Sequence, residues 1–256
     1  MNILITAGGT SEKIDDVRSI GNTATGRLGS LIADCFLEDE KVSVTYLCSK
    51  SAVRPQNPRA RILPIDNVQS LQNAVESEMR SSSYDAVVHS MAVSDYTVKY
   101  SISSEELAKR LAEVTRNEGF KNGHLAEQIH AALLTCGGRP QTGKISSEIG
   151  HLFLCLEKTP KIIGLFKKLQ PKTVLVGFKL LSNVEEQALL QAAENLMERN
   201  GCDFVLANDL KNINEDRHGA ILLGKDHCET RLGTRLEIAH AIKGSVMRKI
   251  EEGNRK

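Results

Sequence analysis

Aromatic residues are scarce in this sequence, and neither sign of charge is in excess. Phe, Trp and Tyr make up 4% of the 256 residues, Trp is absent, and the formal net charge is +1. Few aromatic rings leave few platforms on which single-stranded bases can stack. A nearly neutral chain has no bulk field that attracts nucleic acid or an anionic membrane. We therefore expect no nucleic-acid partner and no membrane partner.

Long apolar runs and paired cysteines are missing too. No apolar run approaches the ~20 residues of a membrane-spanning helix, and no basic segment or cleavage site of a signal peptide precedes the first strand. No two of the six cysteines have C-x-x-C spacing, which favours free, mostly buried thiols and a cytoplasmic location. A zinc site at His218, His227 and Cys228 is conceivable, but adjacent side chains rarely point at one metal. We assign no metal-ligating residue.

The common nucleotide motifs are also absent. The sequence has no G-x-G-x-x-G turn and no Gly-Lys-Ser/Thr of a Walker A loop. Its one Tyr-x-x-x-Lys, from Tyr46 to Lys50, lies in the wrong place for a short-chain dehydrogenase. An NADP-dependent reductase of Rossmann type is therefore disfavoured. It stays open as an alternative, together with a non-catalytic nucleotide sensor.

The most informative stretch that is present covers residues 2–29. A buried strand is predicted at 2–6, and it runs into Gly8-Gly9-Thr10. After a polar loop, Gly26-Arg27-Leu28-Gly29 opens a helix with apolar periodicity. The N–H groups and positive dipole of a helix N-terminus, and the missing Cβ atoms of glycine, favour a bound anion. This stretch predicts a phosphate site split over two glycine segments.

Strands and helices alternate along most of the chain. This alternation predicts an α/β fold with a doubly wound, mostly parallel, Rossmann-like sheet, and we treat 1–256 as a single α/β domain. Residues 99–143 break the alternation with scattered glycines, and we predict a flap or dimerisation insertion there. The alternation resumes with a strand at 152–156. Asn183 is expected to cap the helix that follows the strand at 173–178.

The carboxyl ends of the strands predict where a ligand binds. Ligands of doubly wound sheets bind beyond these ends. The residues expected there are Gly8-Gly9-Thr10, Ser90 to Asp95, Phe178-Lys179 and Asn208-Asp209. Residues from four separate strands should therefore meet at one crevice.

Four polar residues each have a structural and a functional interpretation. Lys144 is by composition a solvated turn residue, but a cation that follows a flap can close over a polyphosphate. Asp95 either caps its own loop or holds Mg²⁺ or a ligand hydroxyl. Asn22 is a turn residue or orients a carbonyl without adding charge. Arg18 is a surface charge or a fork for a phosphate monoester.

Six motifs in order resemble one known family. They are Ile5-Thr6-Ala7-Gly8-Gly9-Thr10; Asp15-x-Val17-Arg18-x-Ile20-x-Asn22-x-x-Thr25-Gly26-x-x-Gly29; Met91-Ala92-Val93-Ser94-Asp95-Tyr96; Lys144-Ile145-Ser146-Ser147; Gly177-Phe178-Lys179-Leu180; and Ala207-Asn208-Asp209. Together they resemble phosphopantothenate–cysteine ligase of coenzyme A biosynthesis, over nearly the whole chain. Nothing precedes the first strand, so the chain resembles the stand-alone form of that ligase.

The resemblance implies a reaction and its participants. The carboxylate of 4′-phosphopantothenate is activated by CTP or ATP, with Mg²⁺, and the acyl-nucleotide is then attacked by L-cysteine. It also implies a homodimer. In the family, the phosphates lie on the positions of Gly9, Thr10, Thr25, Gly26 and Gly29, and the base and ribose lie near Phe178 and Asn208. Asn22 and Lys144 are the implied catalytic residues, and Arg18, Asn22, Ala92 and Asp95 the implied substrate contacts. Phe178-Lys179-Leu180 resembles the eukaryotic pattern, which leaves CTP and ATP both open.

Overall fold

The computed structural model describes residues 1–117, 125–135, 143–214 and 217–254. The chain divides into two compact units, which we describe separately. Unit 1 contains Met1–Thr10, Asn22–Val93 and Lys161–Lys256, and unit 2 contains Ser11–Gly21 and Ser94–Pro160. Unit 2 therefore includes the segment where the sequence predicted an insertion, extends beyond it on both sides, and takes in part of the polar loop that follows the first glycines. Residues 118–124 and 136–142 of the predicted insertion lie outside the described residues.

Unit 1 is built on an eight-stranded sheet in the order β12-β11-β10-β9-β6-β1-β4-β5. The six strands from β10 to β5 are parallel, and β11 and β12 are antiparallel additions. This confirms the predicted α/β fold with a mostly parallel sheet. The strands are β1 (Asn2–Ala7), β4 (Ser43–Ser49), β5 (Arg61–Ile65), β6 (Ala86–His89), β9 (Val174–Leu181), β10 (Phe204–Ile213), β11 (His218–Gly224) and β12 (Glu229–Leu232).

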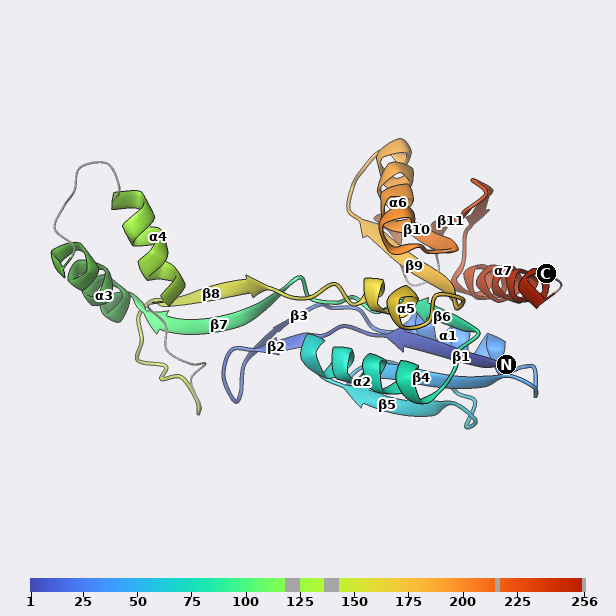
Figure 1. The fold of residues 1–256 in the computed structure, drawn as a ribbon, viewed down its shortest axis with the longest axis horizontal. Coiled ribbons are helices and arrows are strands. Elements are labelled where there is room, and N and C mark those ends of the chain that lie inside the picture. Colours follow the sequence, from blue (N-terminus) through green and yellow to red (C-terminus); the bar gives the residue numbers. More distant parts are fainter. Residues whose placement is uncertain (118–124, 136–142, 215–216, 255–256) are drawn as a thin grey trace. The chain divides into compact units, whose positions relative to one another are not determined.

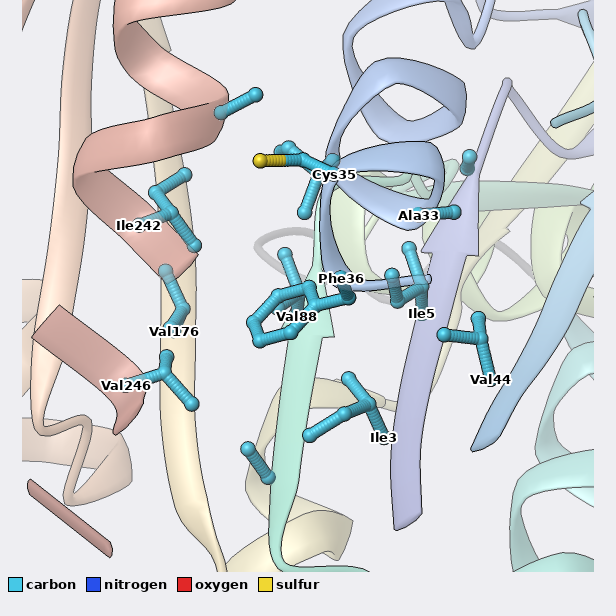
Figure 2. Packing of buried hydrophobic residues seen from close by; sticks show 14 of the residues in the cluster. Ile3, Ile5, Ala33, Cys35, Phe36, Val44, Val88, Val176, Ile242 and Val246 are labelled. Atoms are coloured by element: carbon cyan, nitrogen blue, oxygen red, sulfur yellow. The ribbon is translucent and has the colours of Figure 1, made fainter. Parts of the chain in front are cut away.

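Helices cover both faces of this sheet, because the central strands are apolar on both sides. They are α1 (Arg27–Phe36), α2 (Val68–Ser81), α5 (Ile163–Leu169), α6 (Glu186–Asn200) and α7 (Arg235–Asn254). Residues of α1 and α7 pack against one set of strand side chains, and residues of α2, α5 and α6 against the other. Figure 2 shows Phe36 of α1 and Ile242 of α7 facing Ile5, Val88 and Val176 of the sheet. Each fully buried side chain of this kind contributes roughly 1.5–3 kcal/mol.

Unit 2 contains two small antiparallel sheets and two helices (Figure 1). Its elements are β2 (Ser11–Lys13), β3 (Ser19–Gly21), β7 (Tyr96–Ser103), α3 (Ser104–Asn117), α4 (Leu125–Thr135) and β8 (Leu152–Lys158). Strands β7 and β8 pair with each other, and β2 pairs with β3 as a hairpin. The hairpin is fastened to β7 by Thr97, whose hydroxyl donates to Glu12 Oε2 at 2.7 Å.

Two details of the predicted elements are wrong. The strand predicted at 152–156 is β8, which pairs with β7 in unit 2 and does not continue the large sheet. Asn183 does not cap α6: the helix begins at Glu186, and Asn183 has a positive φ of 54°. The backbone N–H of Asn183 donates instead to Asp209 Oδ1 at 2.8 Å, and Asp209 lies 26 residues later in the chain. Among the described helices, none combines the length and apolar character needed to cross a membrane.

Candidate functional site

In unit 1, the first of the two glycine segments pairs with the residue that follows a neighbouring strand. Gly8-Gly9-Thr10 follows β1, and Ala92 follows the neighbouring strand β6. Thr10 N donates to Ala92 O at 3.1 Å, and Ala92 N donates to Gly8 O at 2.9 Å. The parallel pairing of β1 with β6 is thus continued past the strand ends by a bridge between Gly9 and Ala92.

Glycine is required here because the backbones approach closely. A Cβ built at Gly9 would lie 2.5 Å from Asn22 O, and one at Gly29 would lie 2.6 Å from Ala7 Cβ. At Gly26, φ is +76°, a conformation that side chains other than glycine rarely adopt. We call Gly8–Thr10, Asn22, Thr25–Gly29 and Ala92 the glycine cradle.

The N-terminus of α1 gives the cradle its positive character. Gly26 is the N-cap and has no side chain to bond the first N–H groups, and the first turn contains no acidic residue. The hydroxyl of Thr25 accepts from Arg27 N at 3.4 Å, a long bond. Because helix N–H groups that lack a side-chain cap attract anions, this arrangement suits phosphate oxygens.

Asn22 is fixed within the cradle. Its Nδ2 donates to Ala92 O at 3.1 Å, and its backbone N donates to Thr10 O at 3.3 Å. The amide is thereby held beside the ends of β1 and β6 without a charged neighbour in these bonds. Such an amide has the chemistry to orient a carbonyl or carboxylate of a ligand, which is one of the two interpretations that the sequence left open for Asn22.

Phe178 and Asn208 lie within β9 and β10, which continue to Leu181 and Ile213, and not at the strand ends where the sequence predicted them. In the parallel ladder Phe178 is opposite Leu206, and Asn208 is opposite Leu180. Phe178 is half-buried and packs on the same cluster as Leu206, so Asn208, two residues after Leu206, lies on the same face. Asn208 is 7% exposed, and its Oδ1 has no hydrogen-bond partner in the described structure. A buried acceptor of this kind is costly unless a ligand satisfies it.

Asp209, next to Asn208, has a structural role. Burial alone would raise the pKa of its carboxyl, but N–H groups of Val184, Asn183 and Lys211 donate to it and lower the pKa from 3.8 to about 2. The ionised carboxylate holds the loop that leaves β9. Asp209 also lines a groove of about 470 Å³ between residues of α6, β10, β11 and β12, and among the described residues there it is the one that the sequence placed at the predicted crevice.

In unit 2 the structure brings Arg18 and Lys144 together. Arg18 Nη2 donates to the carbonyl of Ile145, the residue after Lys144, at 2.6 Å. Asp15 accepts from Arg18 Nε at 2.9 Å and from Ile145 N at 3.1 Å. The side chain of Lys144 is exposed. Arg18 therefore has a structural role, a hydrogen bond to the backbone next to Lys144, in addition to the ligand role predicted from the sequence.

The remaining predictions concern Asp95 and metals. Asp95 is exposed and belongs to unit 2, where its carbonyl accepts from Thr159 N at 3.0 Å. Within the described residues, His218, His227 and Cys228 do not converge on a metal site; the group that does is Cys35, Glu38 and His240. Lys243 already donates to Glu38 there at 2.8 Å. A Mg²⁺ ion would suit the cradle as a partner of the ligand's phosphates, because Mg²⁺ is usually held by phosphates and water with few protein ligands.

Asp15 is the functional candidate that sequence reasoning did not single out. Its carboxylate organises the turn between β2 and β3, where Val17 N and Arg18 N donate to Oδ1 at 2.9 and 2.7 Å. The pattern Asp-x-Val-Arg indicates such a turn. The bond to Ile145, 130 residues away, has no local signal.

Comparison with known proteins places these residues in a family context. Residues 1–118 and 138–250 match the family described as the DNA/pantothenate metabolism flavoprotein C-terminal domain. Over 224 residues, the chain is 34% identical to the coenzyme A biosynthesis bifunctional protein CoaBC of Thermococcus kodakarensis. The aligned region covers 88% of this chain and 45% of that protein. It is 25% identical over 236 residues to phosphopantothenate–cysteine ligase 2 of Oryza sativa, covering 83% of this chain and 69% of that protein.

A solved structure agrees with the fold over nearly the whole chain. The DNA/pantothenate metabolism flavoprotein of Streptococcus pneumoniae superposes with a TM-score of 0.79 and 36% identity, covering 97% of this chain and 99% of that one. The chain spans about half the length of the bifunctional relatives, namely 45%, 51% and 52% of three of them.

Proposed function

The chain belongs to the family of the DNA/pantothenate metabolism flavoprotein C-terminal domain, and from this premise we propose that it is a phosphopantothenate–cysteine ligase. The observation that carries the proposal is the glycine cradle, in which Asn22 and Ala92 lie beside an α-helix N-terminus with no acidic residue in its first turn. This arrangement suits a carboxylate and a phosphate held next to each other.

The proposed reaction has two steps. A carboxylate oxygen of 4′-phosphopantothenate attacks the α-phosphorus of a nucleoside triphosphate, the bond to the β-phosphate oxygen breaks, and pyrophosphate leaves. The amine of L-cysteine then attacks the acyl carbon of the mixed anhydride and loses a proton, and the nucleoside monophosphate leaves. Neither step needs a protein nucleophile. Positioning and charge stabilisation are sufficient chemistry for the chain to supply.

Each predicted residue has a role in this reaction. Gly9, Thr10, Thr25, Gly26 and Gly29 bind the phosphates through the cradle. Phe178 packs on the base or ribose, and the buried amide of Asn208 supplies a polar contact there. Asn22 and Ala92 orient the acyl group. Lys144 neutralises charge on the attacked phosphate, and Arg18 and Asp95 contact the phosphopantothenate.

The nucleotide is CTP or ATP, delivered with Mg²⁺ on its phosphates, and the assembly we propose is a homodimer located in the cytoplasm. Support for ligase chemistry over an NADP-dependent reductase comes from the split glycine segments. A dinucleotide turn places its glycines in one continuous loop, whereas here Gly9 and Gly26 belong to separate segments that approach each other where a Cβ built at Gly26 would lie 3.2 Å from Gly8 N.

Pyrophosphate release tests the proposal. With phosphopantothenate and L-cysteine present, the protein should release pyrophosphate from CTP or ATP, and the nucleotide preference follows from comparing the two. Lys144→Ala should lower turnover at least 10-fold with the fold intact, whereas Lys109→Ala, an exposed lysine of α3, should not. A folded protein that releases no pyrophosphate but binds NADPH tightly is instead a reductase.

A further inference from the structure

The backbone on both sides of Lys144 is held by two consecutive aspartates. Asp16 Oδ2 accepts from Gly143 N at 2.9 Å, and Asp15 Oδ2 accepts from Ile145 N at 3.1 Å. Both aspartates lie in the turn between β2 and β3, which we call the Asp15–Asp16 turn. The residue between the two held N–H groups is Lys144.

The Asp15 contact is buried and charged. Asp15 is 4% exposed and Ile145 is 2% exposed. Burial alone would raise the pKa of the Asp15 carboxyl, but the N–H groups of Val17, Ile145 and Arg18 donate to it and lower the pKa from 3.8 to about 2. The carboxylate is therefore ionised at every pH at which the protein would work. The guanidinium of Arg18 closes the arrangement by bonding both Asp15 and the Ile145 carbonyl.

We propose that Asp15 is a positioning residue for Lys144, which it places by fixing the Ile145 backbone with its ionised carboxylate. This proposal rests on the proposed function, because it assigns Asp15 to the lysine that neutralises phosphate charge. The exposed Asp16 adds a second hydrogen bond, which it accepts from the Gly143 backbone N–H. The Asp15–Asp16 turn fixes where the lysine side chain leaves the backbone, and that side chain is exposed.

Asp15→Asn is the informative substitution because it keeps the shape of the side chain. In aspartate, Oδ1 accepts from Val17 N and Arg18 N, and Oδ2 accepts from Arg18 Nε and Ile145 N. An asparagine has only one oxygen, so its NH₂ group must face two donors whichever way the amide is turned. Half of the contacts are lost without a change in volume.

A double-mutant cycle tests whether Asp15 acts through Lys144. Asp15→Asn should lower the rate of pyrophosphate release about 10- to 100-fold in the parent protein, with the KM for nucleotide changed less than about 3-fold. In the Lys144→Ala background the same substitution should change the rate by less than about 3-fold. An equal loss in both backgrounds overturns the proposal. Asp85→Asn is the control, because Asp85 accepts a backbone N–H from Asn2 at 2.7 Å outside the Asp15–Asp16 turn.

Amide hydrogen exchange gives a readout that does not depend on activity. Exchange of the Ile145 amide should speed up at least about 10-fold in Asp15→Asn and stay unchanged in Asp85→Asn. Unchanged exchange in Asp15→Asn overturns the proposal even in a protein without ligase turnover, whereas absent turnover in the parent overturns only the proposed function. If Asp15→Asn does not fold, Asp16→Asn carries the same cycle, with exchange read at Gly143.

Discussion

Replacing Gly29 by alanine tests the close packing of α1 against the end of the sheet. A Cβ at this position would lie 2.6 Å from Ala7 Cβ and 2.7 Å from Ser90 Oγ, whereas carbon atoms pack at about 3.5–4.0 Å. Ala7 is fully buried in β1, and the Ser90 hydroxyl donates to Thr6 O at 2.7 Å, so neither neighbour can withdraw without loss. Overpacking of this kind costs about 1–3 kcal/mol.

Gly244, inside α7, is the matched control. Nothing in the described parts of the chain lies within 4 Å of a Cβ built there. Alanine stabilises a helix interior over glycine by roughly 0.5–1 kcal/mol, so Gly244→Ala should raise Tm by about 1–4 °C. In Gly29→Ala, the higher helix propensity of alanine stabilises the fold by at most the same free energy. The net loss is then about 0–2.5 kcal/mol, which should lower Tm by up to about 10 °C.

Thermal unfolding of the two variants, followed by circular dichroism, measures this difference. Calorimetry with CTP and ATP measures binding, which should weaken in Gly29→Ala because the added methyl group pushes the N-terminus of α1 away from Gly8–Thr10. A Gly29→Ala protein as stable as Gly244→Ala would refute the packing argument. Lowered stability with unchanged nucleotide affinity would refute the idea that this close approach builds a phosphate cradle.

Three further substitutions probe other parts of the molecule. Gly143→Ala should lower ligase turnover in steady-state kinetics, because φ at Gly143 is +96° and alanine would redirect the backbone that enters Lys144, although no described atom lies within 4 Å of its Cβ. Asn208→Leu should raise the Tm of the ligand-free protein, because the buried Oδ1 costs roughly 1–3 kcal/mol without a partner, and calorimetry should find weaker nucleotide binding. Burial lowers the pKa of His89 from 6.5 to about 4. As the pH falls through this range, the unfolded chain binds the proton before the folded protein does, so the free energy of unfolding should decrease by ~3 kcal/mol. Urea titrations across that range should find a loss that is smaller by this amount in His89→Gln, because His218, whose pKa burial also lowers from 6.5 to about 4, still takes up a proton there.

The central sheet could be predicted from the sequence because its signals are local. Strand β9 is a continuous apolar run, and its residues Val174, Leu175 and Val176 are buried. Because proline cannot donate to a strand ladder, Pro64 indicates a strand that ends there or lies at a sheet edge, and β5 is the last strand of the sheet. Asn67 is a residue type that favours the N-cap position, and it caps α2 in a capping box with Ser70. In each case the residues that form the element also carry the pattern that predicts it.

The wrong predictions of secondary structure arise where a residue far away in the sequence supplies a hydrogen-bond partner. Asn183 matched the pattern of an N-cap, but the carboxylate of Asp209 accepts its backbone N–H and that of Val184, and α6 starts only at Glu186. Strand β7 was not predicted because its ladder partner, β8, lies beyond the segment that was assigned to an insertion. Pairings of this kind depend on the whole topology, which a window of neighbouring residues does not contain.

The same reasoning changes the interpretation of Lys144. From the sequence, Lys144 was either a solvated turn residue or a mobile ammonium that follows a flap, and hydrogen bonds to residues 127 and 130 positions earlier hold the backbone on both sides of it. In the proposed ligase, ordering the Lys144 side chain on a phosphate would cost up to about 2 kcal/mol of conformational entropy. Ordering a loop would cost roughly 1–2 kcal/mol for each residue. In the proposed reaction, a backbone that is already held leaves more of the binding free energy for stabilising charge on the phosphate, and this is the contribution that we propose for Asp15.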